Sequence, residues 1–229
     1  MRATTTKHCA RILIATLVST VVPLAAQSSG KRGSAPSGSL DEGLLDPSWF
    51  GAELAFVETD EIDYFWVAEG FELRGRTIQW QDWPEPTEFL GEDGAGRDEN
   101  DFRLARQMAN EMARSFADIF NRELGGAFPS SREEGEILAE GRIVDCSTGN
   151  RAAKALVGFG AGAGKTAIDV RFTDKATGEL VMAIHHRVVS GTSWSTTDSK
   201  FFKWVKKMGK EMAEDGVQEL YDDGELRKN

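Results

Sequence analysis

The sequence predicts an α+β domain, in which a small, largely antiparallel sheet packs against two amphipathic helices in the order β-α-β-β-β-α, with an extra N-terminal strand or hairpin. Three observations support this fold class. Residues 166–173 alternate between apolar and other side chains, which is the two-residue period of a strand. Residues 98–124 and 198–221 repeat their apolar side chains every three or four positions, which is the period of a helix. Gly, Pro and Asp clusters separate these segments.

Strand-forming residues also occur before the first helix and between the two helices. Residues 64–73 and 77–83 are rich in aromatic and β-branched side chains and are interrupted by glycines, which predicts two strand-like runs. Residues 136–146 predict a further strand with Gly141 inside it. A glycine within a strand indicates a bulge or a close approach to the backbone.

Residues 166–173 and 180–189 are expected to pair as an antiparallel hairpin. The connecting turn contains Asp174, Thr177 and Gly178. An aspartate can accept hydrogen bonds from backbone amides of the turn, and a glycine can adopt a positive φ. This turn chemistry predicts that the two strands lie side by side.

The final helix has an unusual order of charges, with lysines in its first half and acidic residues in its second. The helix dipole favours the reverse order by about 0.3 kcal/mol per exposed charge. One interpretation is a surface that contacts an anionic partner, such as lipid headgroups or an acidic protein. This candidate surface consists of Lys203, Lys206, Lys207, Lys210 and Trp204, with Phe202 beside them. The alternative is a solvated face whose lysine stems cover apolar surface.

The N-terminal residues indicate export. Residues 1–26 have three basic residues, then an uncharged apolar run, then small residues, which is the layout of a secretory signal peptide. We expect a linker at 27–47, a single α+β domain at 48–222 and a flexible tail at 223–229. The mature chain is expected to have no transmembrane segment and to be periplasmic or peripherally associated with the outer membrane. Cys9 precedes the apolar run, so it is not placed to carry a lipid anchor.

The composition argues against nucleic-acid binding. Removal of residues 1–26 leaves 24 basic and 37 acidic residues, a formal net charge of −13. Binding to phosphates requires a basic surface. The mature chain keeps one cysteine, Cys146, which cannot form an intramolecular disulfide, and we expect it to be a small buried residue.

A glycine loop, 158–164, resembles a phosphate-binding loop but lacks its spacing. If Gly164, Lys165 and Thr166 provided the G-K-T sequence, the first glycine would be at position 159, which is Phe159. A strand follows the loop, whereas a phosphate loop opens a helix. Gly158, Gly160, Gly162 and Gly164 are therefore interpreted as structural, and no cofactor is expected.

No catalytic or metal site is apparent from sequence motifs. His185 and His186 are adjacent, so on a regular strand their side chains point to opposite faces and cannot bind the same ion. The sequence contains no G-x-S-x-G motif. Acidic residues are abundant, but a catalytic carboxylate pair cannot be recognised without geometry.

The motifs that remain resemble a known family. Gly141, then G-N-R at 149–151, G-F-G-A-G at 158–162, and Asp174 with T-G-E at 177–179 occur in an order similar to that of the bacterial envelope family called domain of unknown function 4410. The resemblance covers residues 136–191 and extends more weakly to residue 64 and through the final helix. It implies an extracytoplasmic α+β domain, and it implies no catalytic residue.

The leading hypothesis is therefore a non-enzymatic envelope protein that binds another envelope protein or an anionic envelope surface, or that forms homo-oligomers. One alternative is a hydrolase of envelope glycan or peptide, with a carboxylate pair or His186 in a groove lined by Trp66, Trp80 or Trp83. Another is a carrier that binds a small ligand in the same groove.

Overall fold

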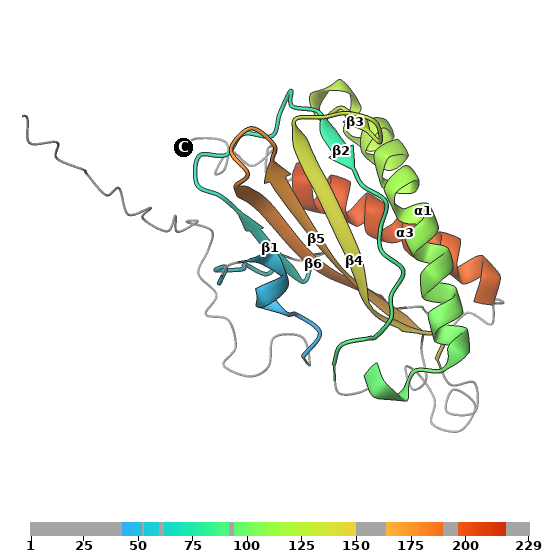
Figure 1. Cartoon of the computed structure of the whole chain (residues 1–229). Helices are drawn as coiled ribbons and strands as arrows, with labels where there is room; N and C mark the ends of the chain where they lie inside the picture. The colour runs from blue at the N-terminus through green and yellow to red at the C-terminus, as the bar shows by residue number, and fades with distance from the viewer. Residues whose placement is uncertain are drawn as a thin grey trace, which may run out of the picture.

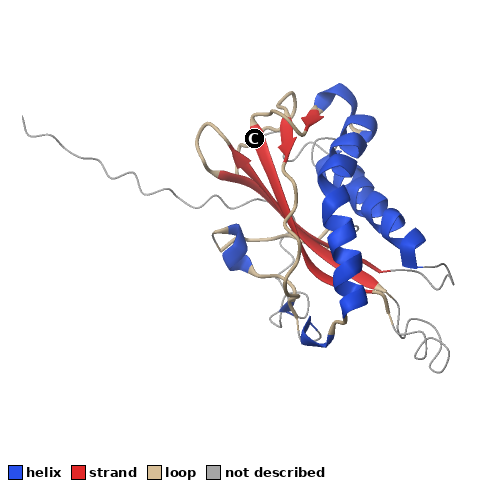
Figure 2. Cartoon of the chain, turned by 45° about the vertical axis from the view of Figure 1, so that its right-hand side comes forward, coloured by secondary structure: helices blue, strands red, loops and turns tan. Residues whose placement is uncertain are grey.

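The computed structural model describes residues 43–51, 53–59, 62–91, 94–149, 164–189 and 197–218. These residues form an α+β fold in which two long helices cover one face of a six-stranded sheet (Figures 1 and 2). The helices are α1 (Glu99–Glu123) and α3 (Thr197–Glu211), and a π-helical segment, Met212–Gln218, continues α3. The predicted α+β class is confirmed.

The sheet is mixed, with the strand order β1-β6-β5-β4-β2-β3. The strands are β1 (Tyr64–Val67), β2 (Ile78–Trp80), β3 (Ser130–Ser131), β4 (Ile137–Ser147), β5 (Lys165–Asp174) and β6 (Leu180–Val189). Strands β1, β6, β5 and β4 run antiparallel, whereas β2 runs parallel to both β4 and β3. The expectation of a largely antiparallel sheet therefore holds only for the first four strands in this order.

The two strand-like runs expected before α1 form short strands, β1 and β2, that do not pair with each other. β1 lies beside β6, and β2 lies beside β4. Gly70 and Gly75, in the connection between them, have φ values of 70° and 81°. Helix α1 lies between β2 and β4 in the sequence, and such a crossover allows two strands to run parallel. The two runs therefore do not form a hairpin with each other, and Phe65 of β1 instead makes an isolated antiparallel bridge with Val57.

Strands β5 and β6 form the expected antiparallel hairpin. The backbone oxygen of Asp174 accepts a hydrogen bond from the amide of Gly178 at 2.7 Å, and its carboxylate accepts one from the amide of Ala176 at 2.8 Å. Gly178 has a φ of 73°. The hydroxyl of Thr177 accepts a hydrogen bond from the amide of Glu179, so the turn is held by local hydrogen bonds.

Helix α1 begins with a capping box, as its sequence favours. The side chain of Asp98 accepts hydrogen bonds from the amides of Asn100 and Asp101, and the side chain of Asp101 accepts one from the amide of Asp98. Gly125, with a φ of 58°, follows the C-terminal end of the helix. The buried face of α1 packs against the sheet and α3.

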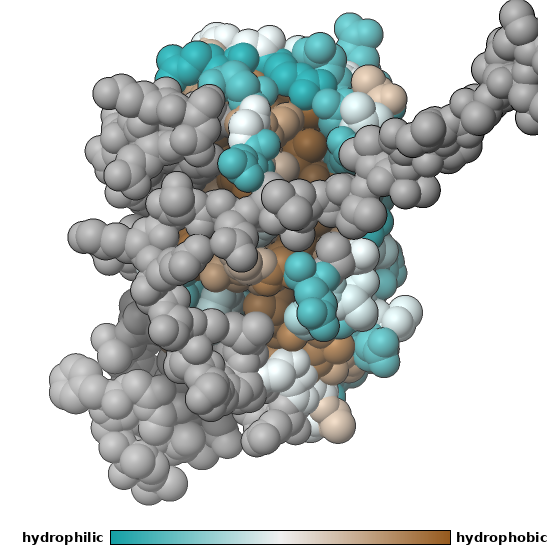
Figure 3. Space-filling model, turned by 90° about the vertical axis from the view of Figure 1, so that its left-hand side faces the viewer, coloured by the Kyte–Doolittle hydropathy of each residue, from teal (hydrophilic) through white to brown (hydrophobic). Residues whose placement is uncertain are grey.

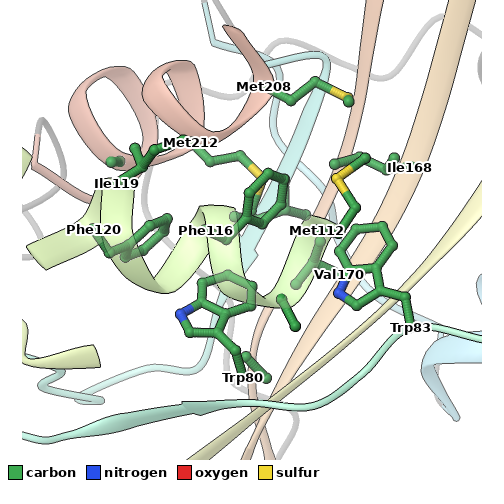
Figure 4. Packing of buried hydrophobic residues seen from close by; sticks show 14 of the residues in the cluster. Trp80, Trp83, Met112, Phe116, Ile119, Phe120, Ile168, Val170, Met208 and Met212 are labelled. Atoms are coloured by element: carbon green, nitrogen blue, oxygen red, sulfur yellow. The ribbon is translucent and has the colours of Figure 1, made fainter. Parts of the chain in front are cut away.

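The core between the helices and the sheet is built around two tryptophans (Figure 4). The rings of Trp80 and Trp83 meet the ring of Phe116 edge to face, with centroid distances of 5.3 and 5.6 Å. A Cβ atom at Gly141 would lie 2.1 Å from the ring of Trp83. The glycine in β4 therefore allows the close approach that its position predicted, and the irregularity of β4 lies nearby, between Ile143 and Asp145.

The other face of the sheet is covered by residues that precede β1, including a 3₁₀ turn, Pro47–Phe50. Leu44 and Leu45 are 2% and 6% exposed, because they pack against the sheet and its neighbours. The packed part of the chain thus begins before residue 48, the expected start of the domain.

Candidate functional site

The exposed side of α3 brings together one aromatic ring and four ammonium groups. This α3 outer face consists of Phe202, Lys203, Lys206, Lys207 and Lys210. Residues three and four positions apart lie on the same side of a helix, which explains why these side chains are neighbours. Phe202 is 54% exposed, which is unusual for a large apolar side chain in the described part of the chain. The four lysines selected from the sequence therefore share one accessible surface.

The lysines of this face differ in their ion pairs. The ammonium group of Lys207 lies 2.5 Å from a carboxylate oxygen of Glu211, and that of Lys210 lies 3.1 Å from Glu214. Lys203 and Lys206 are exposed and form no ion pair with any residue that the structure describes. Both side chains lie on the exposed side of α3.

Trp204 does not belong to the α3 outer face. It is 4% exposed and lies on the inner side of the helix with Phe201, Val205 and Met208. A Cβ atom at Gly164 would lie 2.9 Å from the ring of Trp204, so the last glycine of the predicted structural loop lies directly against this side chain. Trp204 is therefore part of the core and does not belong to the contact surface that was predicted from its sequence position.

The other members of the glycine loop, Gly158, Gly160 and Gly162, lie outside the described residues. At Gly164, a Cβ atom would lie 2.8 Å from the backbone oxygen of Ser147. A larger residue at position 164 would therefore collide with backbone, which is the reason for a glycine there.

A buried charge cluster anchors the inner side of α3. The Nδ1 atom of His186 lies 3.2 Å from a carboxylate oxygen of Asp63, and its Nε2 atom lies 2.9 Å from Glu211. The same oxygen of Asp63 accepts a hydrogen bond from the amide of Arg187 at 2.6 Å. Both ring nitrogens of His186 face acceptor atoms, so the ring donates from both when it is protonated. The cluster joins β6 to α3 and to the segment before β1.

The charges of this cluster stabilise one another. Burial opposes ionisation of His186, but hydrogen bonds to Asp63 and Glu211 outweigh it and raise the pKa of the imidazole. Burial also opposes ionisation of the two carboxylates. His186 and Arg187 together outweigh it at Asp63, and His186 and Lys207 together outweigh it at Glu211, so the pKa of each carboxylate is lowered. Because Lys207 also pairs with Glu211, a change at Lys207 alters both the outer face and this cluster.

The neighbouring residue, His185, points to the opposite face of the sheet. Its Nδ1 atom lies 2.6 Å from a carboxylate oxygen of Asp169, and the other oxygen of Asp169 accepts a hydrogen bond from Arg142 at 2.9 Å. Asp169 and His185 are fully buried. A catalytic base must reach a proton of its substrate, so this buried pair is better explained as part of the packing.

The tryptophans expected to line a groove are separated by the sheet. Trp80 and Trp83 are buried beneath α1, whereas Trp66 packs on the other face with Tyr64. These side chains do not line a common groove. Cys146 is buried, and desolvation raises the pKa of its thiol, so the thiol is not activated as a nucleophile.

The described residues contain neither a metal-binding cluster nor a helix that could span a membrane. Their His, Cys, Asp and Glu side chains form no group of three or more that could hold a metal ion. In the same part of the chain, every helix is too short or too polar to span a membrane.

Several interaction partners in these clusters were not predictable from sequence motifs. Asp63 is far from His186 in sequence, and no motif links them. Asp169 lies opposite His185 in the predicted hairpin, but a β-bulge between Phe172 and Thr173 shifts the register by one residue. A regular count back from the turn would have placed Ile184 opposite Asp169.

Comparisons with known proteins identify a family. The model described as "Domain of unknown function (DUF4410)" matches residues 67–218. No curated protein matches the sequence significantly. A solved PelC dodecamer from Paraburkholderia phytofirmans is similar at 6% sequence identity and a TM-score of 0.38, over 65% of this chain and 94% of that chain. Protein XCC0632 from Xanthomonas campestris is similar at 12% identity and a TM-score of 0.33, over 51% of this chain and 63% of that chain.

Proposed function

We propose that this chain, which belongs to the DUF4410 family, is a non-enzymatic contact module of the cell envelope. In this proposal the chain is exported by residues 1–26 and acts in the periplasm or at the periphery of the outer membrane. The α3 outer face binds an acidic partner, for which we favour another envelope protein.

The observation that carries this proposal is the concentration of positive charge on the α3 outer face of an acidic chain. The whole sequence has a formal net charge of −10, yet the exposed side of α3 presents four lysines around Phe202. Lysine is a flexible point charge without the fixed fork of arginine, so it suits contacts with a diffuse acidic surface. The exposed ring adds apolar surface to the contact, as is common at protein interfaces.

The electrostatic contribution can be estimated from Lys203 and Lys206, which form no ion pair within the described residues. A lysine beside an anionic surface contributes about 1 kcal/mol. Loss of Lys203 and Lys206 together should therefore weaken binding by about 2 kcal/mol, or roughly 30-fold. Charge reversal should have a larger effect, because it adds repulsion.

The experiment is affinity purification with crosslinking from the envelope fraction, using the full chain and the variant Lys203→Glu/Lys206→Glu. We expect the variant to lose its crosslinked partners and to keep its melting temperature. The control Arg103→Glu/Arg114→Glu makes the same change of net charge on α1 and should keep the partners. Unchanged partners in the α3 variant would refute the proposal.

A second arm identifies the class of partner. Binding to vesicles that contain phosphatidylglycerol is measured for the same variants at low and high salt. If vesicles bind the wild-type chain but no protein is crosslinked, the partner is an anionic lipid surface and not the protein that we favour. In both cases binding should weaken as salt increases, because exposed charges are screened.

A further inference from the structure

The helix-free face of the sheet carries charged side chains in rows that cross the strands. Arg142 of β4 lies opposite Asp169 of β5, which lies opposite His185 of β6. In the next row, Glu140 lies opposite Arg171, and their side chains are 3.0 Å apart. A sheet face that served only as core would be apolar, so these rows require another explanation.

The docking segment, residues 44–50, lies across these rows. A carboxylate oxygen of Asp46 is 3.4 Å from Arg142, and the backbone oxygen of Trp49 accepts a hydrogen bond from Arg171 at 2.9 Å. The ring of Trp49 lies 4.8 Å from the guanidinium carbon of each arginine. Both guanidinium groups thus contact the same indole ring. In addition, Arg142 contacts the carboxylate of Asp46, and Arg171 contacts the backbone oxygen of Trp49. Phe50 is buried in the adjacent apolar cluster.

The docking segment keeps its shape through its own hydrogen bonds. The side chain of Asp46 accepts hydrogen bonds from the amide and the hydroxyl of Ser48, and Pro47 begins the 3₁₀ turn. Gly51 ends the turn with a φ of 79°. The described hydrogen bonds between backbone groups of residues 46–51 are internal to the turn, and the segment is not a strand of the sheet. A short peptide of this sequence can therefore adopt the same conformation.

The surroundings of the segment support a role in binding. The family model begins at residue 67, so the docking segment lies outside the matched region. Trp49, Leu54, Phe56 and Trp66 are only partly buried on this side. Figure 3 shows apolar residues gathered on the side of the molecule turned away from α1. Apolar surface of this kind is typical of interaction sites.

We propose that the helix-free face is a peptide-docking site that recognises a carboxylate three residues before an indole ring. Residues 44–50 fill this site in cis, and a segment of the same chemistry from a partner protein replaces them. Arg142 and Arg171 provide the selectivity, since a planar guanidinium both stacks on an aromatic ring and binds a carboxylate. This site is separate from the α3 outer face and does not depend on the function proposed for it.

The test measures binding of a fluorescent peptide with the sequence of residues 43–51 to the full chain by anisotropy. The cis segment competes with the peptide. The apparent affinity of the wild-type chain is therefore the affinity of the open site multiplied by the fraction of chains in which the site is open. Trp49→Ala removes the ring contacts of the cis segment and opens the site. We expect this variant to bind the peptide at least about tenfold more tightly than the wild type does. A peptide with alanine in place of its aspartate and tryptophan should not bind.

Second changes in the Trp49→Ala chain locate the site. Arg171→Ala should abolish peptide binding, whereas Arg103→Ala, on the exposed side of α1, should leave it unchanged. Equal binding to the wild-type and Trp49→Ala chains, or binding to neither, would overturn the proposal. Unfolding of the Trp49→Ala chain, measured by circular dichroism, would also overturn it, because the segment would then be a fixed part of the core.

Discussion

Substitution of His186 by glutamine should destabilise the domain in a pH-dependent manner. The variant leaves Asp63 and Glu211 without their shared cationic partner. Removing one member of a buried ion pair costs about 3 to 5 kcal/mol. We expect about 3 kcal/mol, the lower end, because the side chain of Asp63 is 29% exposed. For a domain of this size the melting temperature should fall by about 6 to 12 °C.

The pH dependence follows from the direction of each pKa shift. The pKa of His186 is raised, so its stabilisation is complete below the unfolded-state value of about 6.5 and is lost as the pH rises through the folded-state pKa. The pKa values of Asp63 and Glu211 are lowered, so their stabilisation is present above about pH 4.5 and is lost as the pH falls. The difference between wild type and variant should therefore be largest between about pH 5 and 6.5.

The assay is urea unfolding of both proteins at pH 6 and pH 9. Lys206→Gln is the control, because Lys206 is exposed and unpaired within the described residues, and it should change the free energy of unfolding little at either pH. The same loss of stability at both pH values in the His186 variant would refute the assignment of an ion-paired imidazolium.

Three further predictions concern packing. Gly141→Ala should lower the free energy of unfolding, measured by thermal unfolding, by about 1 to 3 kcal/mol, since the new methyl group would collide with Trp83. Gly126→Ala is the control, because a methyl group there faces open space. Equal effects of the two substitutions would contradict the contact between Gly141 and Trp83. Gly164→Ala should also lower the melting temperature, because its Cβ atom would press on backbone; an unchanged value would show that the strand can shift. Cys146 should react with a thiol reagent only at the rate of unfolding, because burial raises its pKa; rapid labelling of the native chain would contradict its burial.

The elements with local signals were predictable from the sequence. Helix α1 has a capping aspartate, a regular apolar stripe and glycines after its last turn, so both of its ends could be located within a few residues. The β5–β6 hairpin follows from strict alternation and from the turn chemistry of Asp174 and Gly178. These signals depend on neighbours in sequence, and tertiary packing did not override them.

The pairing of short strands was not predictable, because it depends on distant residues. β1 and β2 are close in sequence, yet they pair with β6 and β4, whose positions are set by the meander and by the crossover through α1. Likewise, the reason for Gly141 is Trp83, and the two are far apart in sequence.

The candidate site was predictable in part. The lysines of α3 could be recognised from the order of charges, but Trp204 was assigned by its proximity to them in sequence. Its spacing from Phe201 and Met208 already placed it on the buried stripe. The partners of His186 come from two other segments, so only the folded chain brings the cluster together.

Site-specific photo-crosslinking in the envelope tests the central claim most directly. A photoreactive residue replaces Lys206 on the α3 outer face or Gln107 on the exposed side of α1. We predict a specific adduct from position 206 that is absent from position 107 and is suppressed by Lys203→Glu. Adducts of equal yield from both positions, or none from position 206, would contradict a contact surface on α3.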